Sequence, residues 1–194
     1  MPKKYSRLVT SLAAAYSLVL AISPALARTV LPVAGSNGDS GAVAECPSGQ
    51  SLVGFSGRTG LWIDAIQMVC AAPGAQPVAS GPRYGGPGGG AVDSFCPRGS
   101  QLSAATLNMT THNRQVAAIN YSCQSIQTGE SADYAFGNPS YRARCPGIGV
   151  GDCGVDTNAF QSCASSEVPI GFTVRYGKDV NGFGLICGRV AGMR

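Results

Sequence analysis

The same segment occurs three times in this chain of 194 residues, and each copy lies between two cysteines. The first copy runs from Cys46 to Cys70 and the third from Cys163 to Cys187, and in both the cysteines are 24 positions apart. The middle copy, Cys96 to Cys123, spans 27 positions and matches less closely. Three copies of one supersecondary unit predict a pseudo-threefold body in which each unit buries its apolar face against the others.

The repeat also predicts how the eight cysteines pair. One pair brackets each copy, and one pair is left to close a local extra loop: Cys46–Cys70, Cys96–Cys123, Cys163–Cys187 and Cys145–Cys153. Each bond closes a short loop and is expected to stabilise the fold by about 2–4 kcal/mol. No metal site or cofactor is expected, because the chain has one histidine and lacks the close Cys-x-x-Cys or His pairs of zinc sites.

The N-terminal segment is typical of a signal peptide. Three basic residues precede an apolar run at 8–22, and Ala-Leu-Ala at 25–27 supplies a small-x-small cleavage site. We expect 1–27 to be removed and 28–194 to form a single domain, exported to the periplasm or beyond the cell. The alternative, a retained anchor, is disfavoured because the run is shorter than a membrane span.

Removal of this segment changes the charge. Three of the 14 basic residues leave with it, so that 11 Lys and Arg face 10 Asp and Glu, and the formal net charge falls from +4 to +1. A near-neutral surface offers no electrostatic footprint for nucleic acid or for an anionic membrane. The oligomeric state is not predicted.

Apolar residues alternate along each copy with a period of two. In the first copy they do so over 51–55 and again over 63–69, and glycines lie between the two stretches. This pattern predicts two strands with one buried face, joined as a hairpin whose far ends are held by its own disulfide. Shorter apolar stretches precede the three hairpins at 41–44, 90–92 and 159–160.

These patterns place the repeats at about 41–72, 90–124 and 157–190, with an insertion at 124–161. The Pro, Gly and Ser-rich tract at 73–90 is either a flexible connector or a structured turn, because glycine-rich sequence serves both.

The motif of the first copy resembles that of a known family. Cys-Pro-x-Gly-x-x-x-x-Gly-Phe begins at Cys46, and Ile-Asp-x-Ile-x-x-x-Cys ends at Cys70. This pattern is similar to the repeat of the vitelline membrane outer-layer proteins and to the related jacalin-type hairpins, and the resemblance covers about 41–187. It implies an all-β fold, a β-prism of three pseudo-repeated β-sheet units, here stapled by disulfides, in an exported bacterial relative.

The resemblance to jacalin-type lectins further implies carbohydrate binding at a loop of the form Gly-x-x-x-Asp. Two places match this form: Gly60 to Asp64, and Gly177 to Asn181 with Asn for Asp. A glycine lets a ligand approach the backbone, and a carboxylate or amide can bind sugar hydroxyls. Trp62 would add an aromatic face for a sugar ring.

A purely structural interpretation of these residues stays open. Asp64 and Asn181 can hydrogen-bond their own turns, and Trp62 can belong to the core. The middle copy has Asn113 and Ala117 at the matching places, so no third site is expected.

The function expected from the sequence is non-enzymatic binding of a carbohydrate or cell-envelope glycan. One alternative is a structural or protein-interaction module of the envelope that binds no sugar. A polysaccharide hydrolase is the other, and it would need a triad on His112 or a carboxylate pair drawn from Asp152, Asp156 and Asp64.

Overall fold

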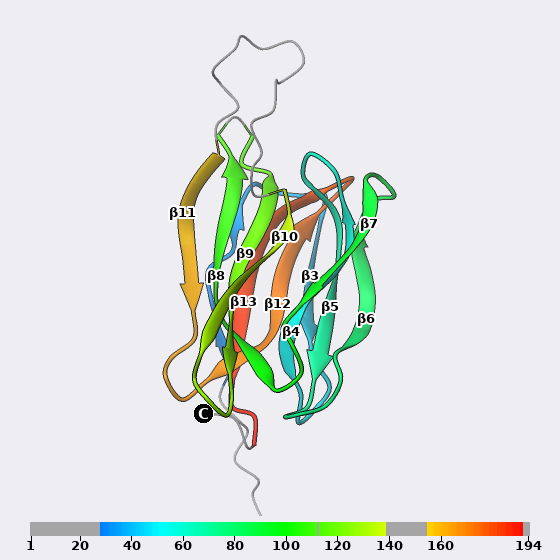
Figure 1. Ribbon diagram of the computed structural model, residues 1–194. Coiled ribbons are helices and arrows are strands. Elements are labelled where there is room, and N and C mark those ends of the chain that lie inside the picture. Colours follow the sequence, from blue (N-terminus) through cyan, green and yellow to red (C-terminus); the bar gives the residue numbers. More distant parts are fainter. Residues whose placement is uncertain (1–27, 112, 139–154, 192–194) are drawn as a thin grey trace, which may run out of the picture.

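The computed structural model describes residues 28–111, 113–138 and 155–191 (Figure 1). Within these ranges every regular element is a β-strand. The expected signal peptide, the pair Cys145–Cys153, His112 and Asp152 lie outside the described residues.

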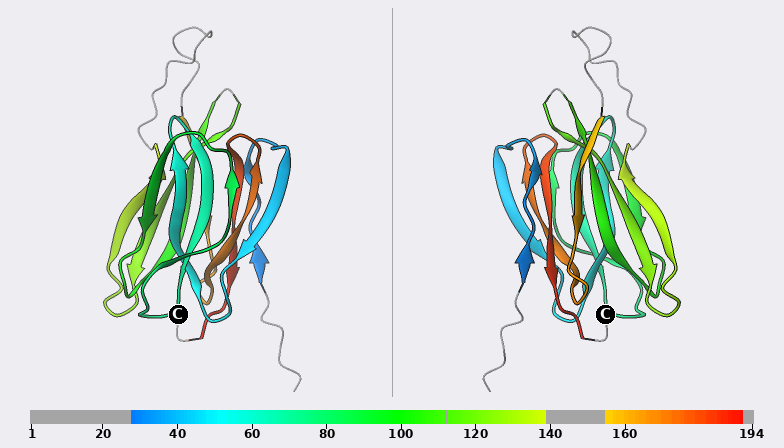
Figure 2. Two further views of the ribbon diagram at one scale, coloured as in Figure 1. Left: turned by 90° about the vertical axis from the view of Figure 1, so that its right-hand side faces the viewer. Right: turned by 90° about the vertical axis from the view of Figure 1, so that its left-hand side faces the viewer.

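The strands form three antiparallel sheets, each built on one of the repeated hairpins. Sheet A has the order β1 (Thr29–Val30), β13 (Val180–Gly188), β12 (Val168–Tyr176) and β3 (Ser40–Glu45), and β2 (Ala34–Gly35) also pairs with β13. Sheet B has the order β6 (Val78–Gly85), β5 (Ile63–Ala71), β4 (Ser51–Thr59) and β7 (Gly90–Phe95). Sheet C has the order β10 (Ser131–Gly137), β9 (Val116–Ser125), β8 (Ser100–Thr110) and β11 (Val155–Ser162). The sheets surround a common axis (Figures 1 and 2), so the predicted all-β prism is confirmed.

The strand ahead of each hairpin joins the preceding sheet instead of its own hairpin. Strand β3 pairs with β12, β7 with β4, and β11 with β8. A residue at the end of such a strand therefore belongs to one sheet, although the hairpin that follows it builds the next.

This exchange gives the disulfides a role that the sequence did not reveal. The three described pairs are those predicted: Cys46–Cys70, Cys96–Cys123 and Cys163–Cys187. The first cysteine of each pair follows β3, β7 or β11, and the second lies in β5, β9 or β13. The bonds thus join sheet A to B, B to C and C to A, so that each hairpin is also tied to a neighbouring sheet and the ring is closed covalently.

Aromatic rings fill the axis of the prism. Phe55 is fully buried, and its ring centroid lies 6.2 Å from that of Phe172 and 5.5 Å from that of Tyr121. Phe55 and Phe172 occupy equivalent positions in sheets B and A, and the equivalent residue in sheet C is Ala105. Ala105 pairs directly with Tyr121, whose large ring occupies space that the small side chain leaves, which explains how the least regular copy still fills the core.

The outer strands β6 and β10 were not expected from the sequence. The tract 73–90 is neither a connector nor only a turn, because it contains β6, an edge strand. Pro82 is tolerated there, since an edge strand does not need every backbone N–H for pairing. Part of the segment interpreted as an insertion, 124–161, forms β10 and most of β11, the two edges of sheet C.

Candidate functional site

The turns of the three hairpins lie at one end of the prism, which we call the apex; it is the upper end in Figures 1 and 2. The first and third turns have the same hydrogen bond. Gly60 N–H donates to Trp62 O at 2.9 Å, and Gly177 N–H donates to Asp179 O at 3.0 Å. The predicted equivalence of Gly60 with Gly177 is therefore confirmed in the structure.

The first residues beyond these turns are held by a second repeated hydrogen bond. The carbonyl oxygens of Asp64, Asn181 and Ala117 each accept an N–H, from Gly86 at 2.9 Å, Ser36 at 2.8 Å and Asn138 at 2.9 Å. The three acceptors all lie six positions before the second cysteine of their repeat. The same backbone arrangement thus forms whether the side chain is a carboxylate, an amide or a methyl group.

A glycine makes this approach possible in each sheet; in sheet C it is Gly137, with φ of 106° and close to the carbonyl oxygen of Ala117. Gly85, with φ of 115°, lies so close to Asp64 that an added Cβ would stand 2.2 Å from its carbonyl oxygen. Gly35, with φ of 118°, has the same relation to Asn181. These backbone angles and contacts favour glycine, and they start the two glycine-containing loops of the apex, 35–39 and 85–89.

An arginine holds each of these loops. Arg58 Nε donates to Gly88 O at 2.6 Å, and Arg58 Nη2 donates to Gly89 O. At the equivalent place in sheet A, Arg175 Nη1 donates to Asn37 Oδ1 at 2.9 Å. The two arginines match in the sequence repeat, but nothing in the sequence indicates which loop they hold.

Asp64 lies beneath the 85–89 loop, and its side chain is closely covered. The residue is only 9% exposed, and a Cβ added to Gly88 or Gly89 would stand 2.1 Å or 2.4 Å from its carboxylate oxygens. Oδ2 is buried without a hydrogen-bond partner. Burial raises the pKa of this carboxyl, and the opposing effects of its own backbone N–H and of Arg58 are smaller.

The equivalent place in sheet A is more open. Asn181 is half-buried and Asp39 is exposed. A Cβ added to Gly177 would stand 2.6 Å from Asp39 Oδ2 and 3.7 Å from Asn181 Oδ1, so a carboxylate and an amide both lie close to this glycine. Asp39 was missed in the sequence because its loop lies far from the Gly-x-x-x-Asn segment along the chain.

The apex loops of the three sheets meet one another. Gln115 Nε2, from sheet C, donates to Asp179 Oδ2 of sheet A at 3.1 Å. Burial, and then the charge of Asp64 in sheet B, raise the pKa of Asp179, while Lys178 and Gln115 lower it. Asp179 occupies the place that the half-buried Trp62 has in the first turn.

The described residues hold no group of three or more His, Cys, Asp or Glu that could bind a metal ion. No helix among them is long and apolar enough to cross a membrane.

No protein-family model matches the chain, and no curated protein matches it in sequence. Several solved structures share its fold. A mannose-binding lectin from champedak has a TM-score of 0.54 and 13% identity, over 84% of this chain and 98% of the lectin. A mannose-specific jacalin-related lectin from Morus nigra, in complex with mannose, has a TM-score of 0.53 and 13% identity, over 84% and 94%. Wild-type Malaysian banana lectin has a TM-score of 0.51 and 14% identity, over 84% and 97%. At such identities the likeness shows the fold alone, which is the β-prism of the jacalin-related lectins.

Proposed function

We propose that this protein is an exported, non-enzymatic carbohydrate-binding protein whose sugar sites lie at the apex, beside Asp64 in sheet B and Asn181 in sheet A. One observation carries the proposal. Asp64, Asn181 and Ala117 make the same main-chain hydrogen bond in three equivalent places. A polar side chain is therefore not needed to build this backbone, and the carboxylate and the amide are available for another purpose.

The chemistry of the two places suits a neutral sugar. The glycines at 60 and 177 allow a ligand to approach the backbone, and carboxylate and amide groups can accept and donate hydrogen bonds with neighbouring hydroxyls. Trp62 lies in the turn before Asp64, where an aromatic face can pack on the apolar side of a sugar ring. The Morus nigra lectin of the same fold is described in complex with mannose, which makes mannosides the first probes.

The two sites are not expected to bind equally. Gly88 and Gly89 cover the Asp64 carboxylate, so binding in sheet B requires these residues to move. Asn181 and Asp39 are accessible without such a movement. We therefore expect the sheet A site to have the higher affinity.

The test is calorimetric titration of the oxidised protein with methyl α-mannoside and mannotriose, supported by a glycan array. Asn181→Ala is expected to weaken binding more than Asp64→Ala, and the double variant is expected to abolish it at the apex. Asp93→Ala, which removes an exposed carboxylate from the outer face of sheet B, serves as the matched control. A folded protein that binds no glycan of the array would support the structural or protein-interaction module instead.

Export is a separate part of the proposal and has its own test. N-terminal sequencing of the protein from the periplasm or the medium is expected to begin at Arg28. Recovery of the intact N-terminus in the membrane fraction would contradict export and cleavage.

A further inference from the structure

The outer face of sheet C carries a hollow of about 520 Å³, away from the apex. This volume falls within the range of roughly 300–1,000 Å³ that is typical of ligand sites. Its lining comes from all four strands and combines small and polar side chains, such as Ala104, Thr106, Asn120, Asp133 and Ala135, with aromatic ones, of which Phe160 is the one on β11.

The strand register explains why these residues share one face. Phe160 pairs with Thr106, Thr106 with Asn120, and Asn120 with Ala135, so the four residues form one row across β11, β8, β9 and β10. Their neighbours along the strands point to the core, as the buried Leu107 and Ile119 do.

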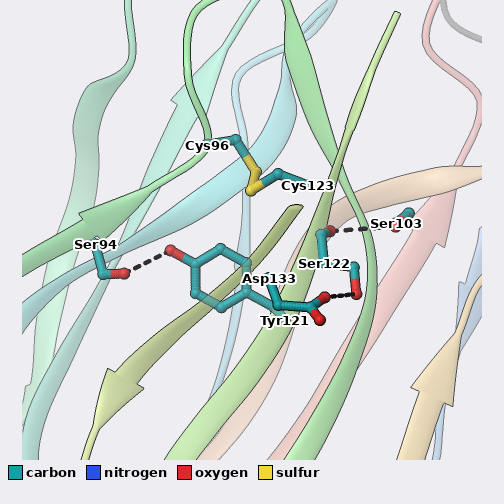
Figure 3. Close-up of a disulfide and its surroundings, with 7 residues drawn as sticks. All are labelled: Ser94, Cys96, Ser103, Tyr121, Ser122, Cys123 and Asp133. Carbon is teal, nitrogen blue, oxygen red and sulfur yellow. Dashed lines mark hydrogen bonds between the residues drawn. A yellow bond between two sulfur atoms is a disulfide. The ribbon is translucent and has the colours of Figure 1, made fainter. Parts of the chain in front are cut away.

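The two rims of the hollow have different chemistry. On β11, Phe160 is 66% exposed. On β10, the Asp133 carboxylate accepts a hydrogen bond from Ser122 Oγ at 2.7 Å, and Figure 3 shows this pair directed away from the Tyr121 ring, which meets Ser94 instead. Three strand spacings separate the rims, or about 14 Å.

The pseudo-threefold symmetry supplies an internal comparison. Phe160 lies three positions before Cys163, and the equivalent residues three positions before the first cysteines of sheets B and A are Asp93 and Val43. Val43 is similarly exposed, at 58%, but has no aromatic ring. An aromatic side chain therefore occupies this position in sheet C alone.

We propose that this face of sheet C is a second carbohydrate site, which binds a neutral oligosaccharide lying across the strands. Phe160 packs on the apolar face of one sugar ring. The Asn120 amide and the Asp133 carboxylate bind hydroxyls of sugar units further along the oligosaccharide. The rims are further apart than the width of one ring, so the ligand is a chain of sugars. The residues that line the hollow carry one negative charge and no positive charge, which disfavours the binding of acidic sugars.

The proposal goes beyond the apex sites and shares no residue with them. It is tested by NMR titration of the oxidised, amide-labelled protein with mannotriose, cellotriose, maltotriose and chitotriose. At least one probe is expected to shift the amides of Thr106, Asn120 and Ala135. Phe160→Ala is expected to weaken that binding about tenfold, because the variant no longer covers the apolar face of the sugar ring. Asp133→Asn is expected to weaken it to a smaller extent.

Two controls separate this site from the apex. Val43→Ala removes the equivalent exposed side chain of sheet A and is expected to leave the titration unchanged. The double variant Asp64→Ala, Asn181→Ala is expected to retain the shifts on sheet C even if all apex binding is abolished. The proposal is overturned if no probe shifts these amides, if Phe160→Ala titrates like the unmodified protein, or if the shifts vanish in the apex double variant.

Discussion

Replacing Asp64 with asparagine is expected to stabilise the protein at neutral pH. The substitution keeps the shape of the side chain and removes its charge, and the equivalent place in sheet A already holds Asn181. The charge is costly in the native state, because the residue is only 9% exposed and Oδ2 has no hydrogen-bond partner. A buried polar group without a partner costs about 1–3 kcal/mol even when it is neutral, and a charged group costs more. Asparagine leaves a polar atom at the same place, so the substitution removes only the additional cost of the charge. The attraction of Arg58 offsets part of that cost, so we expect a gain of about 1–2 kcal/mol in the free energy of unfolding.

The gain should depend on pH, and the direction of the pKa shift sets its sign. Burial raises the native pKa of Asp64 above the ordinary value of 3.8, so the neutral carboxyl is the form that the fold favours. The contribution of the neutral form to stability is complete below that value and is lost as the pH rises through the native pKa. The variant and the unmodified protein should therefore be similar in stability near pH 3 and diverge towards pH 7.

Thermal unfolding followed by circular dichroism, with the disulfides kept oxidised, measures this difference. A gain of this size should raise Tm by about 2–4 °C per kcal/mol for a domain of this length. The exposed carboxylate of Asp93 provides the control, since Asp93→Asn should change stability by less than about 0.5 kcal/mol at any pH. A variant that is less stable than the unmodified protein at pH 7, or a difference that does not change with pH, would refute the reasoning.

Three further perturbations test the fold. Removing the bond between sheets B and C with Cys96→Ala and Cys123→Ala should lower the free energy of unfolding by about 3–4 kcal/mol in a denaturant titration, because the unfolded chain regains the entropy that the closed loop denies it. Phe55→Ala should cost about 3–5 kcal/mol in the same titration, because it leaves a cavity on the axis. Gly85→Ala should destabilise by at least about 1–3 kcal/mol, because it combines a strained backbone angle with a clash against the carbonyl of Asp64. Amide exchange of residues 85–89 should then accelerate, and unchanged protection there would contradict the close packing of this loop.

The repeat could be predicted from the sequence because the features that define it are close together along the chain. Cysteine spacing, alternating apolar residues and turn glycines all lie within one hairpin, so the three hairpins and the disulfide that brackets each of them were predicted. The pairing of β3, β7 and β11 with the preceding hairpin is not local. No spacing within one copy indicates it, and the cyclic linkage of the sheets by the disulfides was missed for that reason.

The edge strands were missed for a different reason. The composition around Pro82 is that of a turn or connector, because an edge strand lacks the constraints that give a central strand its apolar alternation. In sheet C, β10 has one fully buried side chain, Phe136, and otherwise little apolar signal.

The positions of the candidate residues were predicted, but their surroundings were not. The motif placed Asp64 and Asn181 just beyond equivalent turns, as the structure has them. It did not indicate that one is covered and the other half-exposed, because that difference comes from the loops 85–89 and 35–39, which lie outside the motif. Asp39 belongs to the candidate site only because the loop 35–39 brings it close to Gly177.

Two properties of Asp64 favour the proposed ligand role over a role in the turn. A residue kept for turn chemistry should supply a hydrogen bond that the turn needs, yet Ala117 gives the same main-chain arrangement without a polar side chain. Such a residue should also stabilise the fold, yet the Asp64 carboxylate is desolvated and has an unsatisfied oxygen. A side chain that the backbone conformation does not require and that destabilises the fold is expected at positions where function determines the residue type. The turn interpretation accounts for the glycines of the apex, and it leaves the charge of Asp64 unexplained.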